Sequence, residues 1–464
     1  MINEFFTVAN VRGLPDQEYA QLLKLTNVFM AHNSANYRKQ KYYEGKIGLG
    51  DVNLGIALPK GLAGLEIGCS WGAKCVDVLA ARSMFDGFVD ENGAEMSDLT
   101  ALVQDNNLIA EYNKACRDEL KYGCTFATLS YDPAIGCKIR FHSPMTAAAI
   151  WDGDLGRISC GFAIIDTAPD NVEKVWTPSL VYLYTDLDIW VLRRQDYIWT
   201  AERHPHRMGR PLMEALVWNA TSDKPFGRSR IKEPVRRLID GYVRTIANAS
   251  IGLEFATAPQ KYLLGVTDDQ YDKVVNQKFK QYVGNILAAT VNPETGEKPS
   301  FGQLAQGSLA PHVEMLRMLS TQFSAATGLT VTDTGVVNDA NPTSSDAILA
   351  QSQTLVSMAE QLNTGNGDAL RTIALMALAI ANETTIDGLD EGVTSIMAHF
   401  KNPAMPSVAV TADAAIKIAS ARAAFAETDT FLEMIGFSQA DARRIKAQET
   451  RARGVAVLGE LGGE

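Results

Sequence analysis

The stretch "PFGRSRIKEPVRRLIDGYVRTIANASIGLEF" (residues 225–255) joins a short turn to a long helical pattern. Apolar residues recur at the three- and four-residue spacing of an amphipathic helix, at Val235, Leu238, Ile239, Tyr242, Ile246, Ala249 and Leu253. A second such stripe lies within 308–327, at Leu309, Val313, Leu316, Leu319 and Phe323. The two patterns predict a pair of long helices separated by a mixed insert at 256–307.

The chain on either side of this helix pair predicts an α+β fold. Helical patterns cover about 16–38, 71–82 and 108–122, and six short β-rich stretches separated by turns follow between about 123 and 202. These stretches predict an antiparallel meander. Beyond the second long helix, helical patterns run from after residue 342 to about 363, over 368–382, and through an alanine-rich region at about 411–454 that breaks near Ser438.

Composition bounds the class of protein. The 464 residues are 46 % apolar and 21 % charged, which is ordinary globular usage and long enough for about two to four domains. No uncharged apolar run approaches a membrane span and the N-terminus lacks a signal-peptide pattern, so we expect a cytoplasmic protein. The net charge of −11 argues against coating nucleic acid, although nucleic acid could still slide past such a protein. Six scattered cysteines without a CxxC pair predict reduced thiols.

One stretch suggests an enzyme: "GLEIGCSWGAKCVDVLAAR" (residues 64–82) looks like the glycine-rich loop of a class I methyltransferase. Such a loop needs a strand before it, a helix after it and an acidic ribose ligand on the next strand. The preceding run contains proline and several glycines, and the chain does not continue the alternation of strand and helix. We therefore expect a loop and a helix whose Val76, Leu79 and Ala80 point inward, with no ribose for Glu66 to bind. The methyltransferase stays as an alternative.

Other catalytic signals are weak. The chain has no GxxxxGK[ST], GxSxG or HExxH motif. His204 and His206 form an HxH pair in a proline-containing stretch, for which a surface loop is the favoured interpretation. We expect no catalytic site, no metal and no cofactor.

Several further stretches form an ordered series along the chain. They are "KYYEGKI" (41–47), "AKCVDVLAARSMFDGF" (73–88), "NNLIAEYNKACRDELKYGCTFATLSYD" (106–132), "HSPMTAAAIWD" (142–152) and "TGLTVTDTGVVNDANPTSSDAILAQSQTLVSMAE" (327–360). Together with the opening stretch, extended to Gly265, they resemble the portal proteins of long-tailed bacteriophages over essentially the whole chain. Thr330 stands where the family pattern "TGLP" has proline, and "DTG" replaces the usual "LG".

The resemblance implies a portal fold with named regions. These are an α+β wing (1–228), a first stem helix (229–255), a small α/β clip (256–307), a second stem helix (308–327), a tunnel loop (328–341), a long wing helix with a following helix (342–404) and a helical crown (405–464).

The resemblance also implies a function. Such proteins form twelve-membered rings at one capsid vertex, through which double-stranded DNA is packaged and ejected without sequence-specific contacts. The implied partners are further copies of the chain, the large terminase, a head–tail adaptor, and the major capsid and scaffold proteins. The implied location is the virion, after assembly in the host cytoplasm. Another head structural or connector protein is the closest alternative.

Candidate site residues follow from the implied regions. In the tunnel loop we expect Val331, Thr332, Asp333, Thr334, Val336, Val337, Asn338 and Asp339 to face passing DNA, the valines as apolar contacts and the aspartates repelling phosphate. On the stem, ion pairs between subunits, channel contacts or a solvated face remain open for Arg228, Arg230, Lys232, Arg236, Arg237 and Arg244. In the clip, terminase or adaptor contact or a solvated face remains open for Lys273, Lys278 and Lys280.

Overall fold

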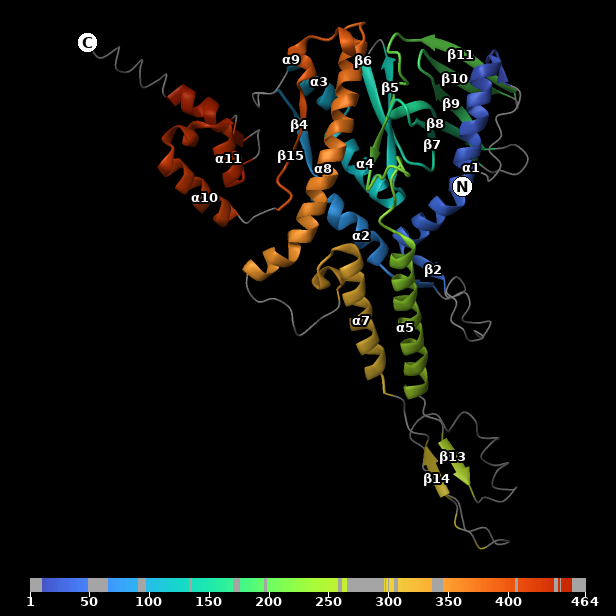
Figure 1. Ribbon diagram of the computed structural model, residues 1–464. Helices are drawn as coiled ribbons and strands as arrows, with labels where there is room; N and C mark the ends of the chain where they lie inside the picture. Colours follow the sequence, from blue (N-terminus) through green and yellow to red (C-terminus); the bar gives the residue numbers. More distant parts are fainter. Residues whose placement is uncertain are drawn as a thin grey trace. The chain divides into compact units, whose positions relative to one another are not determined.

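The computed structural model describes residues 11–48, 66–90, 97–132, 136–169, 176–195, 198–257, 261–264, 296, 298, 300–303, 308–335, 345–404, 408–437, 441–442 and 444–452. The chain divides into two compact units, Met1–Lys401 and Asn402–Glu464. Figure 1 shows the elements of both units. None of the helices in these ranges is long and apolar enough to cross a membrane.

The antiparallel meander predicted over residues 123–202 is confirmed for its last four stretches, whereas the first two, at 124–132 and 136–142, lie in a second sheet. The meander comprises β7 (Ala147–Asp152), β8 (Arg157–Pro169), β9 (Trp176–Tyr184), β10 (Asp188–Gln195) and β11 (Ile198–Pro205), each antiparallel to the next. The short β1 (Val11–Arg12) adds to β11 in parallel. The long helix α1 (Asp16–Glu44), which extends beyond the expected Arg38, buries Leu22, Leu25 and Phe29 against this sheet.

A second sheet has the order β12–β5–β6, built from β5 (Cys124–Asp132), β6 (Gly136–His142) and β12 (Met213–Val217). Around it lie α2 (Trp71–Ala80), α3 (Ser97–Asp105) and α4 (Leu108–Tyr122). Small two-stranded sheets join β2 (Lys46–Gly48) to β3 (Glu66–Gly68), and β4 (Phe85–Val89) to β15 (Met397–Phe400). The first unit is therefore a mixed α and β body with one large shared core.

The helix α8 (Ser345–Ala381) is continuous, which corrects the expected break between residues 363 and 368. The segment "NTGNGD" holds two glycines, which favour a break by propensity alone. In the fold, however, Asn366 is fully buried and its amide donates to Tyr112 Oη (3.0 Å) and Glu119 Oε2 (2.8 Å) on α4. Tertiary hydrogen bonds thus hold the helix through a locally weak stretch.

Glu119 makes stability depend on pH. Burial raises the pKa of this carboxyl to about 8 in the folded chain, from an ordinary value of 4.5. Between these two pH values the folded state holds a proton that the unfolded state has released. The contribution of Glu119 to the free energy of unfolding is therefore complete below about pH 4.5 and is lost as the pH rises towards 8. We expect Glu119→Gln to flatten this loss, measured by urea unfolding at pH 5.5, 7 and 8.5.

The control for this pH series is Glu111→Gln, on the same helix, where Glu111 is exposed and pairs with Lys114. It should leave the pH profile unchanged. Parallel profiles for the wild type and Glu119→Gln would contradict the assignment.

The two expected long helices are α5 (Glu233–Thr257) and α7 (Ala310–Thr327), which lie side by side (Figure 1). Gly241 allows α7 to approach, because a Cβ there would lie 3.1 Å from Leu319 Cδ2. Trp71 joins the pair to α2, with its ring 4.6 Å from Tyr242 and 4.7 Å from Phe323 between centroids. Between the helices, β13 (Lys261–Leu264) pairs antiparallel with β14 (Ser300–Gln303).

The remaining described elements are short. In the first unit, the 3₁₀ turn η4 (Ile386–Gly388) and α9 (Glu391–Thr394) follow α8. The second unit contains α10 (Val408–Ala421), η5 (Ala423–Glu427) and α11 (Asp429–Ile435). An edge-to-face contact between Phe425 and Phe431 joins η5 to α11. Helical residues 441–442 and 444–452 agree with the expected helical region, and Ser438 lies outside the described residues.

Candidate functional site

The turn that starts the opening motif is held by backbone contacts. Gly227 has φ +65°, and a Cβ there would lie 2.1 Å from Trp218 O, so only glycine fits. Arg228 N donates to Trp218 O (3.0 Å), and Ser229 Oγ donates to Lys121 O (2.5 Å). The "GRS" letters therefore anchor the start of α5 to the ends of β12 and α4.

Arg230 lies inside the subunit, which corrects the expectation that it serves a subunit interface, the channel or a solvated face. The residue is 6 % exposed, and its guanidinium donates to Cys75 O (2.5 Å) on α2 and Thr327 O (2.7 Å) at the end of α7. It also lies 3.6 Å from Met358 Sδ on α8. Burial lowers the pKa of this guanidinium. One buried cation thus joins α2, α7 and α8.

The other stem cations have several environments. Arg236 donates to Ile231 O (2.9 Å) and lies near the Tyr42 ring, so it folds back onto its own subunit. Arg237 pairs with Glu233 one helical turn away, and Arg228 lies 3.6 Å from Asp223.

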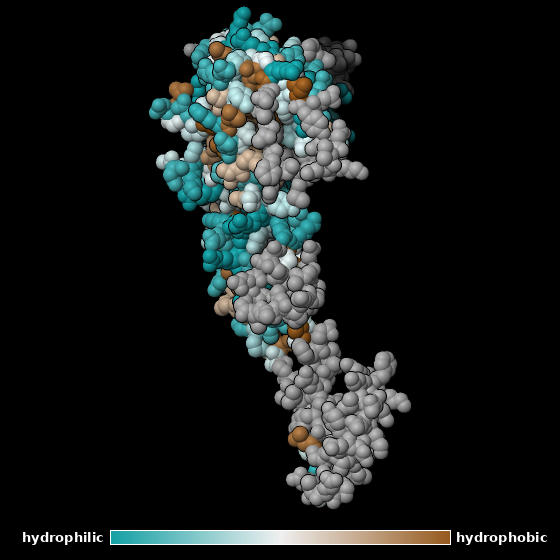
Figure 2. All heavy atoms as spheres, turned by 90° about the vertical axis from the view of Figure 1, so that its right-hand side faces the viewer, coloured by the Kyte–Doolittle hydropathy of each residue, from teal (hydrophilic) through white to brown (hydrophobic). Residues whose placement is uncertain are grey.

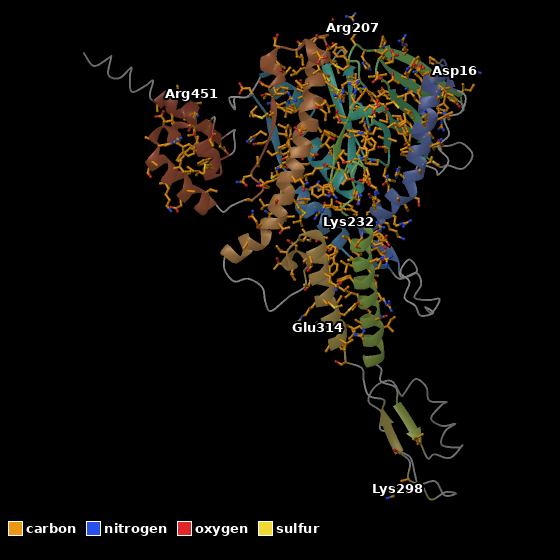
Figure 3. All side chains as sticks on the ribbon, viewed as in Figure 1. Asp16, Arg207, Lys232, Lys298, Glu314 and Arg451 are labelled. Atoms are coloured by element: carbon orange, nitrogen blue, oxygen red, sulfur yellow. The ribbon has the colours of Figure 1, made fainter. Side chains whose placement is uncertain are left out.

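Two of these cations are exposed and unpaired. Lys232 and Arg244 are both exposed, with no ion pair to any described residue. Lys232 marks the point where α5 begins (Figure 3). These two are the stem cations best placed to meet another molecule.

The first part of the expected tunnel loop is a short turn in which Thr334 is buried, which corrects the expectation that this residue faces passing DNA. Residues Val331–Thr334 form the 3₁₀ turn η3, capped by Thr330, and the Asp333 carboxylate accepts from Thr330 N (3.0 Å) and Thr330 Oγ1 (2.7 Å). Thr334 is buried, bonded to Ser320 Oγ (2.6 Å), and its carbonyl accepts from Trp71 Nε1 (3.1 Å).

The substitution of threonine for the family's proline has a physical reason here. Thr330 supplies both the side-chain cap and the backbone N–H that Asp333 accepts, and proline has no such N–H. Val331 is half-buried and Thr332 is exposed. The rest of the expected loop, with Val336, Val337, Asn338 and Asp339, lies outside the described residues, as do Lys273, Lys278 and Lys280.

The helix α7 has a second apolar face that the sequence analysis missed. Leu319 and Phe323 are buried against the subunit, whereas Met315 and Met318 are 39 % and 45 % exposed. At 100° per residue the exposed face spans about 100° and comprises Pro311, Met315, Met318, Ala325 and Ala326, with the polar Gln322 in its middle. The spacing of these residues is visible in the sequence, but the stripe that ends at Phe323 predicts only one buried face.

The described part of the glycine-rich stretch, residues 66–82, packs against the rest of the subunit. Val76, Leu79 and Ala80 are buried, as expected. A Cβ on Gly72 would lie 2.0 Å from Tyr42 O, so this glycine serves the close approach of α2 to α1. β3 pairs antiparallel with β2, so the parallel strand that a nucleotide-binding loop requires is not formed at residues 66–68.

No metal or redox centre emerges within the described ranges. All six cysteines are free and buried there, and no group of three His, Cys, Asp or Glu side chains is close enough together to hold a metal ion. His206 lies 3.2 Å from Thr185 O, and burial lowers its pKa. Among the described residues, the candidate positions therefore contribute packing contacts and exposed helix surfaces.

Comparison with known protein families identifies the class of this protein. A family model described as "Phage portal protein, SPP1 Gp6-like" matches residues 32–454. The chain belongs to this phage portal protein family, which is structural, and it is not an enzyme.

Solved structures with a similar fold come from gene transfer agent particles. Chains from "Virion of native gene transfer agent (GTA) particle" and "Neck of empty GTA particle computed with C6 symmetry" each match at 12 % identity and TM-score 0.45. A chain from "Neck of native GTA particle computed with C12 symmetry" matches at 12 % identity and TM-score 0.43. Each match covers 79 % of this chain and 90 % of the other. No curated protein matches.

Proposed function

We propose that this portal-family chain assembles into a homo-oligomeric ring at one vertex of a virion capsid. The ring is the channel through which double-stranded DNA enters and leaves, and it is the docking site for the large terminase and later for the head–tail adaptor. In this proposal, residues 1–228 and 342–404 are the wing, 229–255 and 308–327 the two stem helices, 256–307 the clip, 328–341 the tunnel loop and 405–464 the crown. Twelve copies are the number that the family resemblance implies.

The exposed apolar face of α7 is the observation that carries this proposal. A helix with apolar residues on two sides is typical of a helix buried between two neighbours. One neighbour is α5 of the same subunit, and the second side has no cover among the described residues. In a ring, the stem of the adjacent subunit supplies that cover, and burying two methionines and two alanines there stabilises the assembly at about 25 cal/mol per Å².

The charge pattern supports the passage of DNA. Each phosphate that Lys or Arg neutralises adds salt-dependent affinity and would slow movement of the duplex. The chain has a net charge of −11, and four of the six expected stem cations contact groups of their own subunit. On the face drawn in Figure 2, hydrophilic residues predominate among the described ones. A duplex passing this stem therefore meets few free cations.

A charged substitution on the exposed face of α7 tests the ring. Met318→Glu should break assembly and leave the subunit folded, because a carboxylate would have to be buried without a partner between two stems. We expect the particle of about 600 kDa, twelve copies of the 50.4 kDa chain, to give way to single subunits. Native mass measurement and negative-stain images of the central hole report the change, and circular dichroism reports folding.

The matched control is Thr321→Glu, which adds the same charge at an exposed polar position of the same helix. It should leave the ring intact. A wild-type chain that stays monomeric at high concentration with scaffold protein present would contradict the proposed function, and an intact ring in Met318→Glu would contradict the α7 interface alone.

A further inference from the structure

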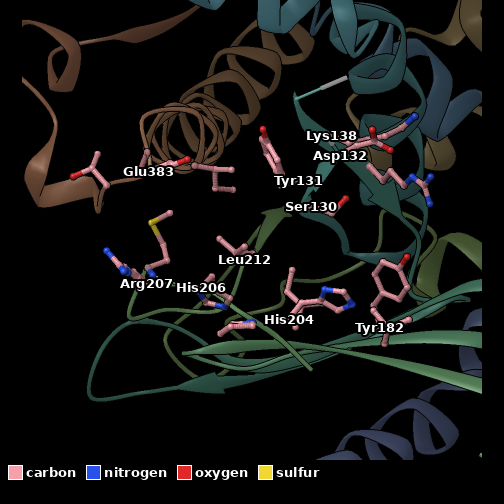
Figure 4. A pocket seen from close by; sticks show the side chains of 18 residues that line it. Ser130, Tyr131, Asp132, Lys138, Tyr182, His204, His206, Arg207, Leu212 and Glu383 are labelled. Carbon is pink, nitrogen blue, oxygen red and sulfur yellow. Dashed lines mark hydrogen bonds between the residues drawn. The ribbon is translucent and has the colours of Figure 1, made fainter. Parts of the chain in front are cut away.

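A groove of about 660 Å³ lies in the first unit, away from the stem. Its walls come from the β5–β6 hairpin, from the ends of β9, β10 and β11, and from the C-terminal end of α8 (Figure 4). The half-buried Met208 and Ile380 contribute apolar surface, above the buried Leu212 and Ile189. In this view, Glu383 and Arg207 stand on one side and Lys138, Asp132 and Tyr182 on the other.

The cations of the groove have no ion-pair partner among the described residues. Lys138, Arg140 and Arg207 line it, and none of them forms an ion pair with a described residue. Burial lowers the pKa of His206, so this imidazole is neutral near pH 7 and adds no charge. The positive charge of the groove therefore comes from these Lys and Arg side chains.

Glu383, at the rim, has an unusual backbone. It follows the last turn of α8 with φ +52°, a left-handed conformation that glycine adopts without cost and other residues adopt at about 1 kcal/mol or more. Glycine at this position would stabilise the helix end. A glutamate placed here at a cost in stability points to a use for its side chain in the groove.

We propose that this groove docks an extended acidic segment of a partner protein. Lys138 and Arg140 lie two residues apart on β6, so their Cα atoms are about 7 Å apart, the repeat of alternate side chains in an extended chain. Carboxylates at alternate positions of the segment pair with these two cations. Apolar side chains nearby in the segment pack on Met208 and Ile380. Asp132 and Glu383 also line the groove, and the Glu383 carboxylate accepts hydrogen bonds from the backbone N–H groups of the segment.

The same two carboxylates favour a peptide over nucleic acid. A nucleic acid strand carries a negative charge at every nucleotide, so it would place phosphates against Asp132 and Glu383. A peptide carries charge only where its sequence has acidic residues. The proposal does not depend on the ring, because every residue it uses belongs to one subunit.

Fluorescence anisotropy with the full-length chain tests the proposal. The probe is a labelled seven-residue peptide in which glutamates alternate with leucine and phenylalanine, and the comparison peptide has lysine in place of each glutamate. We expect the acidic peptide to bind with a Kd of about 10–100 μM and the basic one about tenfold more weakly or worse, since two charge-assisted pairs are lost. Raising the salt concentration should weaken acidic binding.

The double variant Lys138→Glu/Arg140→Glu should lose about tenfold or more of the acidic-peptide affinity. Lys74→Glu, which reverses an exposed cation on α2 outside the groove, should leave it unchanged. Circular dichroism confirms that both variants fold.

Four outcomes would overturn the proposal. One is equal affinity for the acidic and basic peptides, and another is undiminished binding by the double variant. The third is competition by a single-stranded or duplex oligonucleotide at the same concentrations, which would make the groove a nucleic-acid site. A change in the native mass of the double variant without peptide would assign the groove to contact between copies instead.

Discussion

Replacing Gly227 by alanine is expected to destabilise the chain by about 3 kcal/mol or more, the sum of a left-handed backbone cost and steric overpacking. The new Cβ would lie 2.1 Å from Trp218 O and 2.9 Å from Gly123 O. Both are backbone atoms, so relief requires moving β12 or the end of α4. Because this turn starts α5, the displacement reaches the stem. Urea unfolding of the purified subunit measures the loss.

Gly209→Ala is the matched control for Gly227→Ala. Gly209 has nearly the same φ, +64°, but a Cβ there meets no described atom within 4 Å. Gly209→Ala should lose only the cost of placing alanine in a left-handed backbone conformation, about 1 kcal/mol in free energy of unfolding. The difference between the two variants isolates the steric contribution. Equal losses would show that the turn can yield, and the argument for the glycine in "GRS" would then fail.

Replacing Arg230 by alanine is expected to cost about 3–5 kcal/mol in free energy of unfolding. The change leaves a cavity among α2, α7 and α8, and it removes the donor for Thr327 O. That carbonyl is in the last turn of α7, where no further helical N–H is available to it. Arg230→Lys should lie in between, because one ammonium cannot reproduce the planar guanidinium fork that joins two carbonyls.

Arg237→Ala is the control for Arg230→Ala. Arg237 is exposed and pairs only with Glu233 on its own helix, so its loss should be within about 0.5 kcal/mol. Thermal and urea unfolding measure all three variants. If Arg230→Ala is as mild as Arg237→Ala, the buried guanidinium does not hold the three helices together.

Local pattern predicted much of the fold because helices and strands have short repeats. The stripe that includes Val235 and Ile239 marked the buried side of α5, and the alternating β-rich stretches marked the meander. The α8 region shows the limit of this reasoning: "NTGNGD" predicts a break, and only the buried bonds from Asn366 to α4 keep the helix continuous.

The candidate site was less predictable than the fold. Sequence alone placed Arg230 in one cluster with Arg237, although one is buried and the other exposed. Their difference depends on Cys75 and Thr327, which are distant in sequence. The cations of the groove were likewise missed, because Lys138 and Arg207 come from separate elements that only folding brings together.

The sequence by itself determined the class of this protein: the order of its motifs and its pair of long helices around an insert indicate a phage portal protein, and the family match agrees. The tertiary structure decided which of the named residues are free to act. Trp71 and Thr334 are 263 positions apart and share a hydrogen bond, which turns an expected open loop into a packed turn. The reason is physical: periodicity records local geometry, whereas burial and hydrogen-bond partners depend on which distant segments meet.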